Sequence, residues 1–211
     1  MVNGISDGIA GLMLTIEKEL VKISKKPDPE IEKLIEIFIS IHKKLFFSKG
    51  FITDMPTIFF GGAGISQRRA LDLGTRFGQL GFRVGNLDDG CVTNIDTVIY
   101  FSSSATTLKT VSNFNLVRET APGATIIVFT SNPDEEMPKR ADLTIWLPGR
   151  TDVQDEESPL ALLGANFESA CDKLVSILVH KIREKIAESE KLPVEESSVS
   201  ETAMRKRHAP V

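Results

Sequence analysis

The sequence is poor in the residues that build metal centres and disulfide frameworks. Its 211 residues include 2 cysteines, Cys91 and Cys171, and 3 histidines. Two cysteines are too few for a disulfide-stabilised scaffold, and neither has another cysteine or a histidine at the spacing of metal ligands. We therefore expect no metal site and two buried free thiols, with His42 packed on the apolar side of a helix and His180 on a helix surface.

Long apolar runs and an excess of positive charge are also missing. No stretch reaches the roughly 18 apolar residues that a membrane-spanning helix needs. The opening MVNGISDGIAGLM lacks the basic region and cleavage pattern of a signal peptide. The formal net charge is −4, and the basic RKR at 205–207 is too short to outweigh it. The sequence predicts a soluble cytoplasmic protein with no membrane or nucleic-acid partner.

Two amphipathic helices are predicted at the start of the chain. In residues 5–25, apolar side chains recur every three or four positions, which is the spacing of one helical stripe. The proline-containing segment KKPDPE then ends the pattern, because proline ends helices. A second stripe of the same kind spans residues 31–46. We assign residues 1–50 to two leading helices.

Beyond residue 57 the pattern changes to short apolar strands that alternate with helices. The predicted strands are 57–60, 82–84, 97–101, 124–130 and 143–148. A long amphipathic helix is predicted at 159–186. This alternation predicts a parallel sheet with helices on both faces. We expect one domain over 1–190, with its α/β core at 57–190, and a tail at 191–211.

Three loops rich in small or hydroxyl-bearing residues follow the predicted strands. They are GGAGIS at 61–66, FSSSATT at 101–107 and FTSNPDE at 129–135. Right-handed crossovers place the carboxyl ends of parallel strands on one edge, so the loops should line one crevice. Small residues, hydroxyls and unpaired helix N–H groups together form an anion site, which favours a phosphate ligand. A helix N-cap in a plain polar loop is the alternative for the hydroxyl tract, and Ser66 is placed to cap the helix after the first loop.

A dinucleotide is the alternative ligand that the first loop allows. The loop contains Gly62-x-Gly64, and Asp88 and Asp89 lie near the distance expected for a ribose contact. Gln67, however, stands where the third glycine of the fingerprint belongs. The sequence contains no P-loop, H-E-x-x-H or nucleophile-elbow motif. The partial fingerprint leaves a nucleotide-binding oxidoreductase as the third functional alternative.

The order of these motifs resembles the sugar isomerase (SIS) domain family, and within it the 6-phospho-3-hexuloisomerases. The chain carries GAGIS, FSSSATT, TSNPD, RAD and PGR where that family has G-x-G-R-S, S-G-S-G-x-T, T-S-N-P, A-D and P-G-R. The segment LLGANFESA matches the region of the family's glutamate, and the ending RKRHAPV is similar to the family's R-H-A-N-L-E. The resemblance covers nearly the whole chain.

The resemblance implies a three-layer α/β sandwich, with a five-stranded parallel sheet of flavodoxin-like topology and two leading helices. It implies a ketose isomerase that converts 3-hexulose 6-phosphate to fructose 6-phosphate through a cis-enediol, with no metal and no cofactor. It also implies a homo-oligomer, a tetramer or a dimer, whose tail packs on a neighbouring subunit. The alternative is a non-catalytic sugar-phosphate-binding protein of the same fold, such as a sensor or regulatory subunit.

Matching the family motifs residue by residue gives a candidate site. Glu168 would abstract the proton next to the carbonyl, and His208 would polarise the carbonyl or shuttle the hydroxyl proton. An exposed helix glutamate and a histidine in a frayed terminus are the alternatives for these two. The candidate phosphate- and sugar-binding residues are Gly64, Ser66, Ser102, Ser104, Thr106, Thr107, Thr130 and Ser131.

The chain departs from the family pattern inside this candidate site. The departures are Ile65 for an arginine, Gln79 for a histidine, Ser103 and Ala105 for glycines, and Thr106 for an acidic residue. A side chain in place of glycine is costly where the backbone needs a positive φ. Arg76 keeps a matching place, and Arg68 and Arg69 are placed to substitute for the lost arginine. These changes leave open a different ligand, or binding without turnover.

Overall fold

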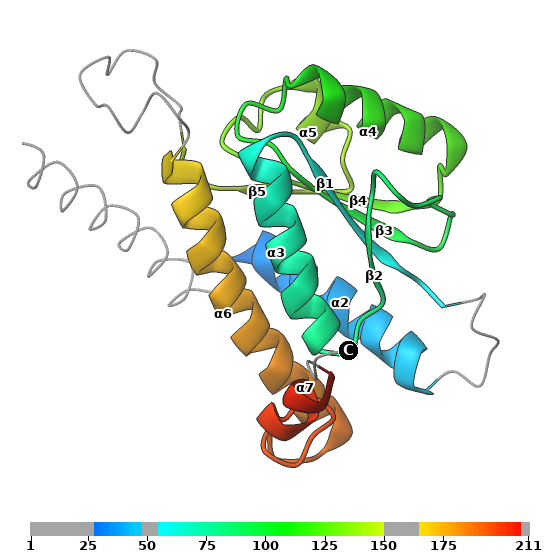
Figure 1. Ribbon diagram of the computed structural model, residues 1–211, viewed down its shortest axis with the longest axis vertical. Helices are drawn as coiled ribbons and strands as arrows, with labels where there is room; N and C mark the ends of the chain where they lie inside the picture. The colour runs from blue at the N-terminus through cyan, green and yellow to red at the C-terminus, as the bar shows by residue number, and fades with distance from the viewer. Residues whose placement is uncertain (1–27, 48–54, 150–164, 208–211) are drawn as a thin grey trace, which may run out of the picture.

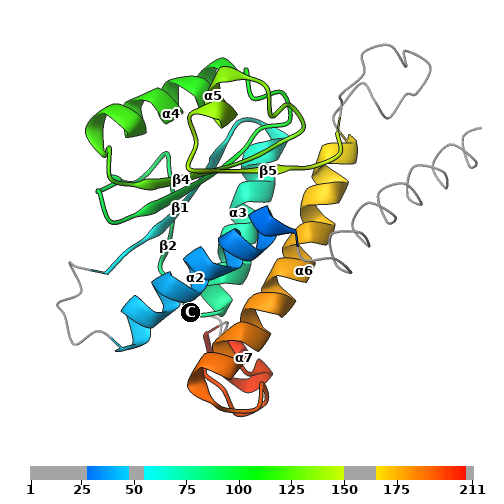
Figure 2. The ribbon, with the colours of Figure 1, turned by 180° about the vertical axis from the view of Figure 1, so that it is seen from behind.

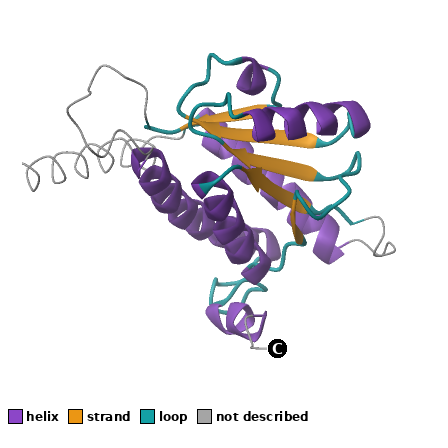
Figure 3. Cartoon of the chain, turned by 45° about the horizontal axis from the view of Figure 1, so that its top comes forward, coloured by secondary structure: helices purple, strands orange, loops and turns teal. Residues whose placement is uncertain are grey.

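A sheet of five strands lies between two layers of helices in the computed structural model, which describes residues 28–47, 55–149 and 165–207 (Figure 1, Figure 3). The strands are β1 Ile58–Gly62, β2 Val84–Asn86, β3 Thr97–Phe101, β4 Thr125–Thr130 and β5 Leu143–Trp146. The helices are α2 Pro29–Phe47, α3 Ile65–Gln79, α4 Leu108–Thr120, α5 Glu136–Lys139, α6 Ala165–Glu190 and α7 Glu201–Arg207. The helix predicted at 5–25 and the predicted helix start at 159–164 lie outside the described residues.

The sheet has the strand order β2-β1-β3-β4-β5, and every pairing in it is parallel. Ile58 of β1 pairs with Val84 of β2 on one side and with Thr97 of β3 on the other. This order is the flavodoxin-like one, in which the strand order reverses between β1 and β3. The predicted five-stranded parallel sheet is confirmed.

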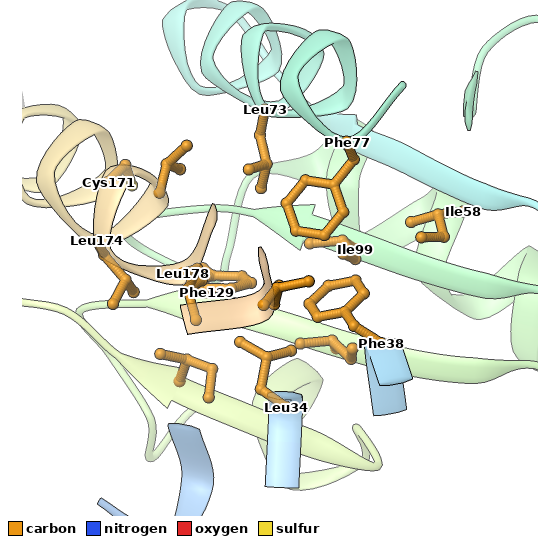
Figure 4. Close-up of a cluster of buried hydrophobic side chains, with 14 of the residues drawn as sticks. Leu34, Phe38, Ile58, Leu73, Phe77, Ile99, Phe129, Cys171, Leu174 and Leu178 are labelled. Atoms are coloured by element: carbon orange, nitrogen blue, oxygen red, sulfur yellow. The ribbon is translucent and has the colours of Figure 1, made fainter. Parts of the chain in front are cut away.

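One face of the sheet is covered by α2, α3 and α6. Their apolar stripes meet the strands in one buried cluster, in which Phe38, Phe77 and Phe129 come from a helix, a second helix and a strand (Figure 4). The rings of Phe38 and Phe77 lie 4.5 Å apart between centroids. Burying such side chains is worth about 1.5–3 kcal/mol each. The packing therefore fixes α3 and α6 side by side.

The other face of the sheet is covered by α4 and α5. Alternation along β3 divides its side chains between the faces: Ile99 and Phe101 belong to the first cluster, and Val98 and Tyr100 belong to the second. The second cluster is smaller and centres on Phe114 of α4. Helices on both faces of a parallel sheet are what the alternating sequence pattern predicted.

The second predicted strand begins two residues later than expected. The sequence pattern placed it at 82–84, but β2 spans Val84–Asn86. Phe82 is instead part of the turn that ends α3, because its N–H donates to the carbonyl of Phe77 at 3.1 Å. Its ring is buried against the helix layer rather than in the strand. An apolar residue that closes a helix end is hard to distinguish from a strand residue by composition alone.

Residues 191–207, the described part of the predicted tail, fold back on their own chain, with α7 beside the end of α6 (Figure 2). Val199 is fully buried in the large cluster, and its carbonyl accepts a hydrogen bond from Arg183 at 3.0 Å. The guanidinium of Arg207 donates to the carbonyl of Gln79 at the end of α3. The predicted contact of the tail with a neighbouring subunit stays a prediction.

Candidate functional site

The three hydroxyl-rich loops lie at the carboxyl ends of neighbouring strands. β1, β3 and β4 are adjacent in the sheet, and each loop leads from one of them toward the next helix. The chain leaves β1 toward α3 on one face of the sheet and leaves β3 toward α4 on the other. The strand order therefore reverses between β1 and β3, at the position where parallel α/β proteins bind their ligands, and we call this position the crevice.

Helix α3 begins two residues earlier than it would if Ser66 were its N-cap. The N-cap is Gly64, whose φ is 59°, and no side chain caps this end. Ser66 is thus already the second helical residue. A Cβ atom on Gly62 would lie 2.9 Å from the carbonyl oxygen of Phe101 and 3.0 Å from the nitrogen of Gln67. Gly62 therefore lets the start of α3 approach the end of β3 closely.

Helix α4 begins at the hydroxyl tract without using its hydroxyl groups as caps. Thr107 is the N-cap residue, with φ −60° and ψ 119°, but its side chain makes no capping hydrogen bond. By contrast, the carboxylate of Asp28 before α2 accepts hydrogen bonds from the N–H groups of Glu30 and Ile31 at 3.0 and 3.2 Å. The two helices that start at the crevice therefore keep first-turn N–H groups that no side chain caps, which suits an anion.

The backbone of the hydroxyl tract needs a left-handed residue at one of the two positions where the family has glycine. Ala105 has a φ of 57°, whereas Ser103 is not among the positive-φ residues. Ala105 is also buried, with 2% of its surface exposed. The turn is closed by its own atoms, since the N–H of Ala105 donates to Ser102 and that of Thr106 donates to the hydroxyl of Ser104.

The third loop is hydrogen-bonded to the backbone of the hydroxyl tract. The hydroxyl of Thr130 donates to the carbonyl of Ser103 at 3.1 Å, and the N–H of Ser131 donates to the same carbonyl at 3.1 Å. The side chains of Ser102, Thr130 and Ser131 are buried, whereas Ser104, Thr106 and Thr107 are exposed. Contact with a ligand stays a prediction for all of them, and the exposed hydroxyls are the ones that solvent reaches.

Glu168 lies in the first turn of α6, next to the third loop. A Cβ atom on Gly149 would lie 1.9 Å from the hydroxyl of Ser131 and 3.1 Å from the Cβ of Phe167, so α6 begins close to that loop. Burial raises the pKa of the Glu168 carboxyl, and the nearby Arg69 guanidinium partly offsets this rise. A carboxylate with a raised pKa is suited to general base catalysis near neutral pH.

A polar groove of about 560 Å³ runs between α3 and α6 beside this glutamate. Arg69 crosses it, with its guanidinium 3.4 Å from the carboxylate of Asp172 and 3.6 Å from that of Asp72. Arg76 and Gln79 line the same groove. Arg69, one of the two arginines placed to substitute for the family's arginine, is therefore engaged with Asp72 and Asp172.

A side-chain cluster that the sequence pattern did not indicate links the starts of α3 and α4. The ammonium of Lys109 lies 2.8 Å from a carboxylate oxygen of Asp88 and 3.2 Å from the amide oxygen of Gln67. The amide nitrogen of Gln67 donates to the same Asp88 oxygen. The three residues come from α3, the loop after β2 and α4. Only their positions after strand ends could have suggested that they meet, since 21 and 42 residues separate Lys109 from its partners.

The histidines and cysteines are placed largely as predicted. His208 lies outside the described residues. His42 is fully buried on α2, and the side chain of His180 is 71% exposed. Cys171 is buried as predicted, but Cys91 is exposed because it lies in the surface loop between β2 and β3. Among the described residues, no helix is apolar enough over a sufficient length to cross a membrane.

The chain is similar to several solved structures over most of its length, although no protein-family model matches it. One match is a proposed phosphosugar isomerase involved in capsule formation from Bacteroides fragilis, at 20% identity and a TM-score of 0.65. The match covers 95% of this chain and 96% of that one. A Methanococcus jannaschii protein, whose structure was used to infer 3-hexulose-6-phosphate isomerase function, matches at 20% identity and a TM-score of 0.56, over 85% of this chain and 99% of that one.

A structure with a bound sugar phosphate has the same fold. The Vibrio vulnificus NanR protein, complexed with ManNAc-6P, matches at 17% identity and a TM-score of 0.61, over 92% of this chain and 67% of that one. In sequence, the chain is 25% identical over 194 residues to an uncharacterised protein of Methanothermobacter thermautotrophicus, covering 85% of this chain and 93% of the relative. The chain therefore has the α/β fold of the SIS-domain sugar isomerases.

Proposed function

We propose that the protein is a sugar-phosphate isomerase that converts 3-hexulose 6-phosphate to fructose 6-phosphate. The observation that carries this proposal is the pair of uncapped helix starts at the β1–β3 crevice, next to exposed hydroxyl groups. Such a cradle suits a phosphate monoester. The fold that the chain shares with phosphosugar proteins supports the same ligand class.

The reaction that we propose moves a carbonyl from C3 to C2 of the sugar. Glu168 takes the proton from C2 and leaves a cis-enediolate between C2 and C3, with the negative charge on the oxygen of C3. The proton is returned to C3, while a hydroxyl proton moves from the oxygen on C2 to the oxygen on C3. The raised pKa of Glu168 supports this role because the carboxyl group must both accept and return a proton. The hydroxyl-rich cradle would hold the phosphate and fix the distance between C2 and this carboxylate.

The test is a coupled assay with purified protein and 3-hexulose 6-phosphate, in which fructose 6-phosphate is detected through NADPH formation by coupling enzymes. We expect turnover by the wild type. Glu168→Gln keeps the shape of the side chain but removes the base, so it should lower kcat by about 10²–10⁴-fold. Glu184→Gln, in an exposed pair with His180 on the same helix, is the matched control and should keep wild-type activity.

The absence of fructose 6-phosphate, at protein concentrations where an authentic isomerase finishes the reaction, would contradict the proposed activity. Full activity in Glu168→Gln would contradict the role of the carboxylate while leaving the activity itself in place. A homo-oligomer in which His208 reaches the site of a neighbouring subunit remains part of the proposal. Substituting His208 by Gln in the same assay tests that part.

A second candidate function is sugar-phosphate binding without turnover. It is favoured by Ile65, which occupies the first position of α3 and is 52% exposed where the family carries arginine. Its support also includes the NanR structure with ManNAc-6P, a protein of the same fold. Calorimetric titration with fructose 6-phosphate separates the two functions. Binding in the absence of turnover would favour the second candidate over the first.

A further inference from the structure

The hydroxyl tract and the backbone N–H groups of the two helix starts beside it offer a phosphate hydrogen-bond donors, but these groups carry no fixed positive charge. Ser104, Thr106 and Thr107 are neutral, and Ile65 supplies no charge at the start of α3. A phosphate monoester carries close to two negative charges at neutral pH, and charged donors bind it far more strongly than neutral ones. A cation near the crevice would therefore decide how tightly the site holds a phosphate.

Lys109 is positioned to be that cation. It lies in the first turn of α4, two residues after the N-cap Thr107. Its ammonium bonds to Gln67, which lies in the first turn of α3 on the other side of the crevice. The Lys109 side chain thus links the first turn of α4 to the first turn of α3. Asp88, which follows β2, accepts from it at 2.8 Å and lies beside the same crevice.

The ion pair between Lys109 and Asp88 is exposed to solvent and therefore weak. The side chains of Lys109 and Asp88 are 47% and 32% exposed, so water and salt weaken their ion pair. The bond to Lys109 is the largest of the influences that lower the pKa of the Asp88 carboxyl, followed in effect by its bond to Gln67. Asp88 is therefore ionised and competes with any anion that enters the crevice. An anion with a double charge, held also by the helix N–H groups, has the advantage in that competition.

We propose that Lys109 is the phosphate-binding cation of this site and that Asp88 and Gln67 hold it across the crevice until a sugar phosphate displaces Asp88. Lys109 then bonds the phosphate, and Asp88 sets the affinity by competing for the ammonium. This inference rests on the proposed function of the crevice as a phosphosugar site. It assigns the positive charge of the site to α4 rather than to the position of Ile65.

The proposal predicts opposite effects for the two partners of one ion pair. In calorimetric titrations with fructose 6-phosphate at low salt, Lys109→Met should weaken binding at least tenfold, and Lys109→Arg should keep affinity within about threefold. Asp88→Asn should tighten binding severalfold, because the ammonium loses its competitor. Lys139→Met, a lysine at the end of α5, is the control and should bind like the wild type.

Each alternative result has one meaning. If Lys109→Met and Asp88→Asn both weaken binding, with melting temperatures lowered together, the ion pair is structural and the inference is overturned. Unchanged affinity in Lys109→Met, with a wild type that binds, overturns the inference but not the proposed function. A wild type that binds neither fructose 6-phosphate nor inorganic phosphate overturns the proposed function, and the inference with it. Titration with fructose, which lacks the phosphate, should show no difference between wild type and Lys109→Met.

Discussion

At the scale of single residues, a buried hydroxyl without a partner lies on β3, the strand that leads into the hydroxyl tract. Tyr100 of β3 is fully buried, and its hydroxyl has no hydrogen-bond partner among the described residues. Burial also raises the pKa of this phenol. A buried polar group without a partner costs about 1–3 kcal/mol of stability. Its ring packs well against Phe114, at 5.9 Å between centroids, so the cost lies in the hydroxyl alone.

We therefore expect Tyr100→Phe to raise the free energy of unfolding by about 1 kcal/mol, since it removes the unpaired hydroxyl and keeps the ring. Thr130→Val is the matched control, because the hydroxyl of Thr130 bonds to both Ser103 and Asn132. That variant should lose about 1 kcal/mol or more. Urea unfolding followed by circular dichroism measures both. Equal losses in the two variants would show that the Tyr100 hydroxyl has a partner after all.

Sequence motifs predicted the residues of the hydroxyl tract but not how the tract uses them. Ser103 and Ala105 both replace glycine, yet only Ala105 takes a positive φ. Nothing in the order of the residues separates the two, because φ is set by how the tract closes over Ser102. The Lys109–Asp88 contact was missed for a similar reason. It depends on the start of α4 and the loop after β2, which meet only after the sheet has formed.

At the scale of elements, the ends of α3 and α6 use the same turn with different residues. In α3, Gly81 has a φ of 95°, and its N–H and that of Phe82 bond back to the helix. In α6, Lys191 takes the same place with a φ of 57°, with equivalent bonds from its N–H and that of Leu192. This is the C-terminal turn that favours glycine, since other residues are strained in the left-handed region.

The two helix-end turns predict that substitutions in them change the free energy of unfolding in opposite directions. Lys191→Gly should raise the free energy of unfolding by up to about 1 kcal/mol, because it relieves a left-handed side chain. Gly81→Ala should lower it by about 1–2 kcal/mol, because it introduces that strain and places a Cβ atom 3.0 Å from the ring of Phe46. Chemical unfolding of both variants tests the argument. A loss of stability in Lys191→Gly would contradict it.

The elements themselves were largely predictable from the sequence. The apolar run TVIYF became β3 with the predicted bounds, because a strand buried on both faces needs unbroken apolar residues. The bounds of β2 were missed, since Phe82 serves the end of α3 instead. The packing of residues 191–207 on the core was not predictable, because Val199 and the partly buried Met204 are isolated apolar contacts in a segment otherwise rich in polar residues.

At the scale of the whole molecule, one buried polar cluster ties the chain end to the leading helix. Nε2 of His42 on α2 lies 3.4 Å from the hydroxyl of Ser198 and 3.9 Å from the carboxylate of Glu190. That carboxylate also accepts hydrogen bonds from the hydroxyl and N–H of Ser198. The ring of His42 stacks on Phe46, over which Arg207 lies. The cluster joins α2, α6 and the segment leading to α7.

Burial is the main influence on the pKa of His42 and lowers it. The Glu190 carboxylate partly offsets this by raising the pKa, whereas the Arg207 guanidinium lowers it further. The folded protein therefore binds a proton at His42 less readily than the unfolded chain, whose histidines titrate near about pH 6.5. Below that pH the unfolded state takes up the proton first, so stability is lost as the pH falls. The raised pKa of Glu168 acts in the opposite direction.

We expect the free energy of unfolding to fall between pH 7.5 and pH 5.5 by less in His42→Phe than in the wild type. The phenyl ring keeps the stack on Phe46 but cannot take up a proton. Glu168 contributes equally to both proteins, so its effect cancels in the comparison. His180→Gln, at an exposed position on α6, should keep the wild-type pH dependence. If His42→Phe and the wild type lose the same free energy over this range, protonation of His42 does not couple to the packing of the chain end.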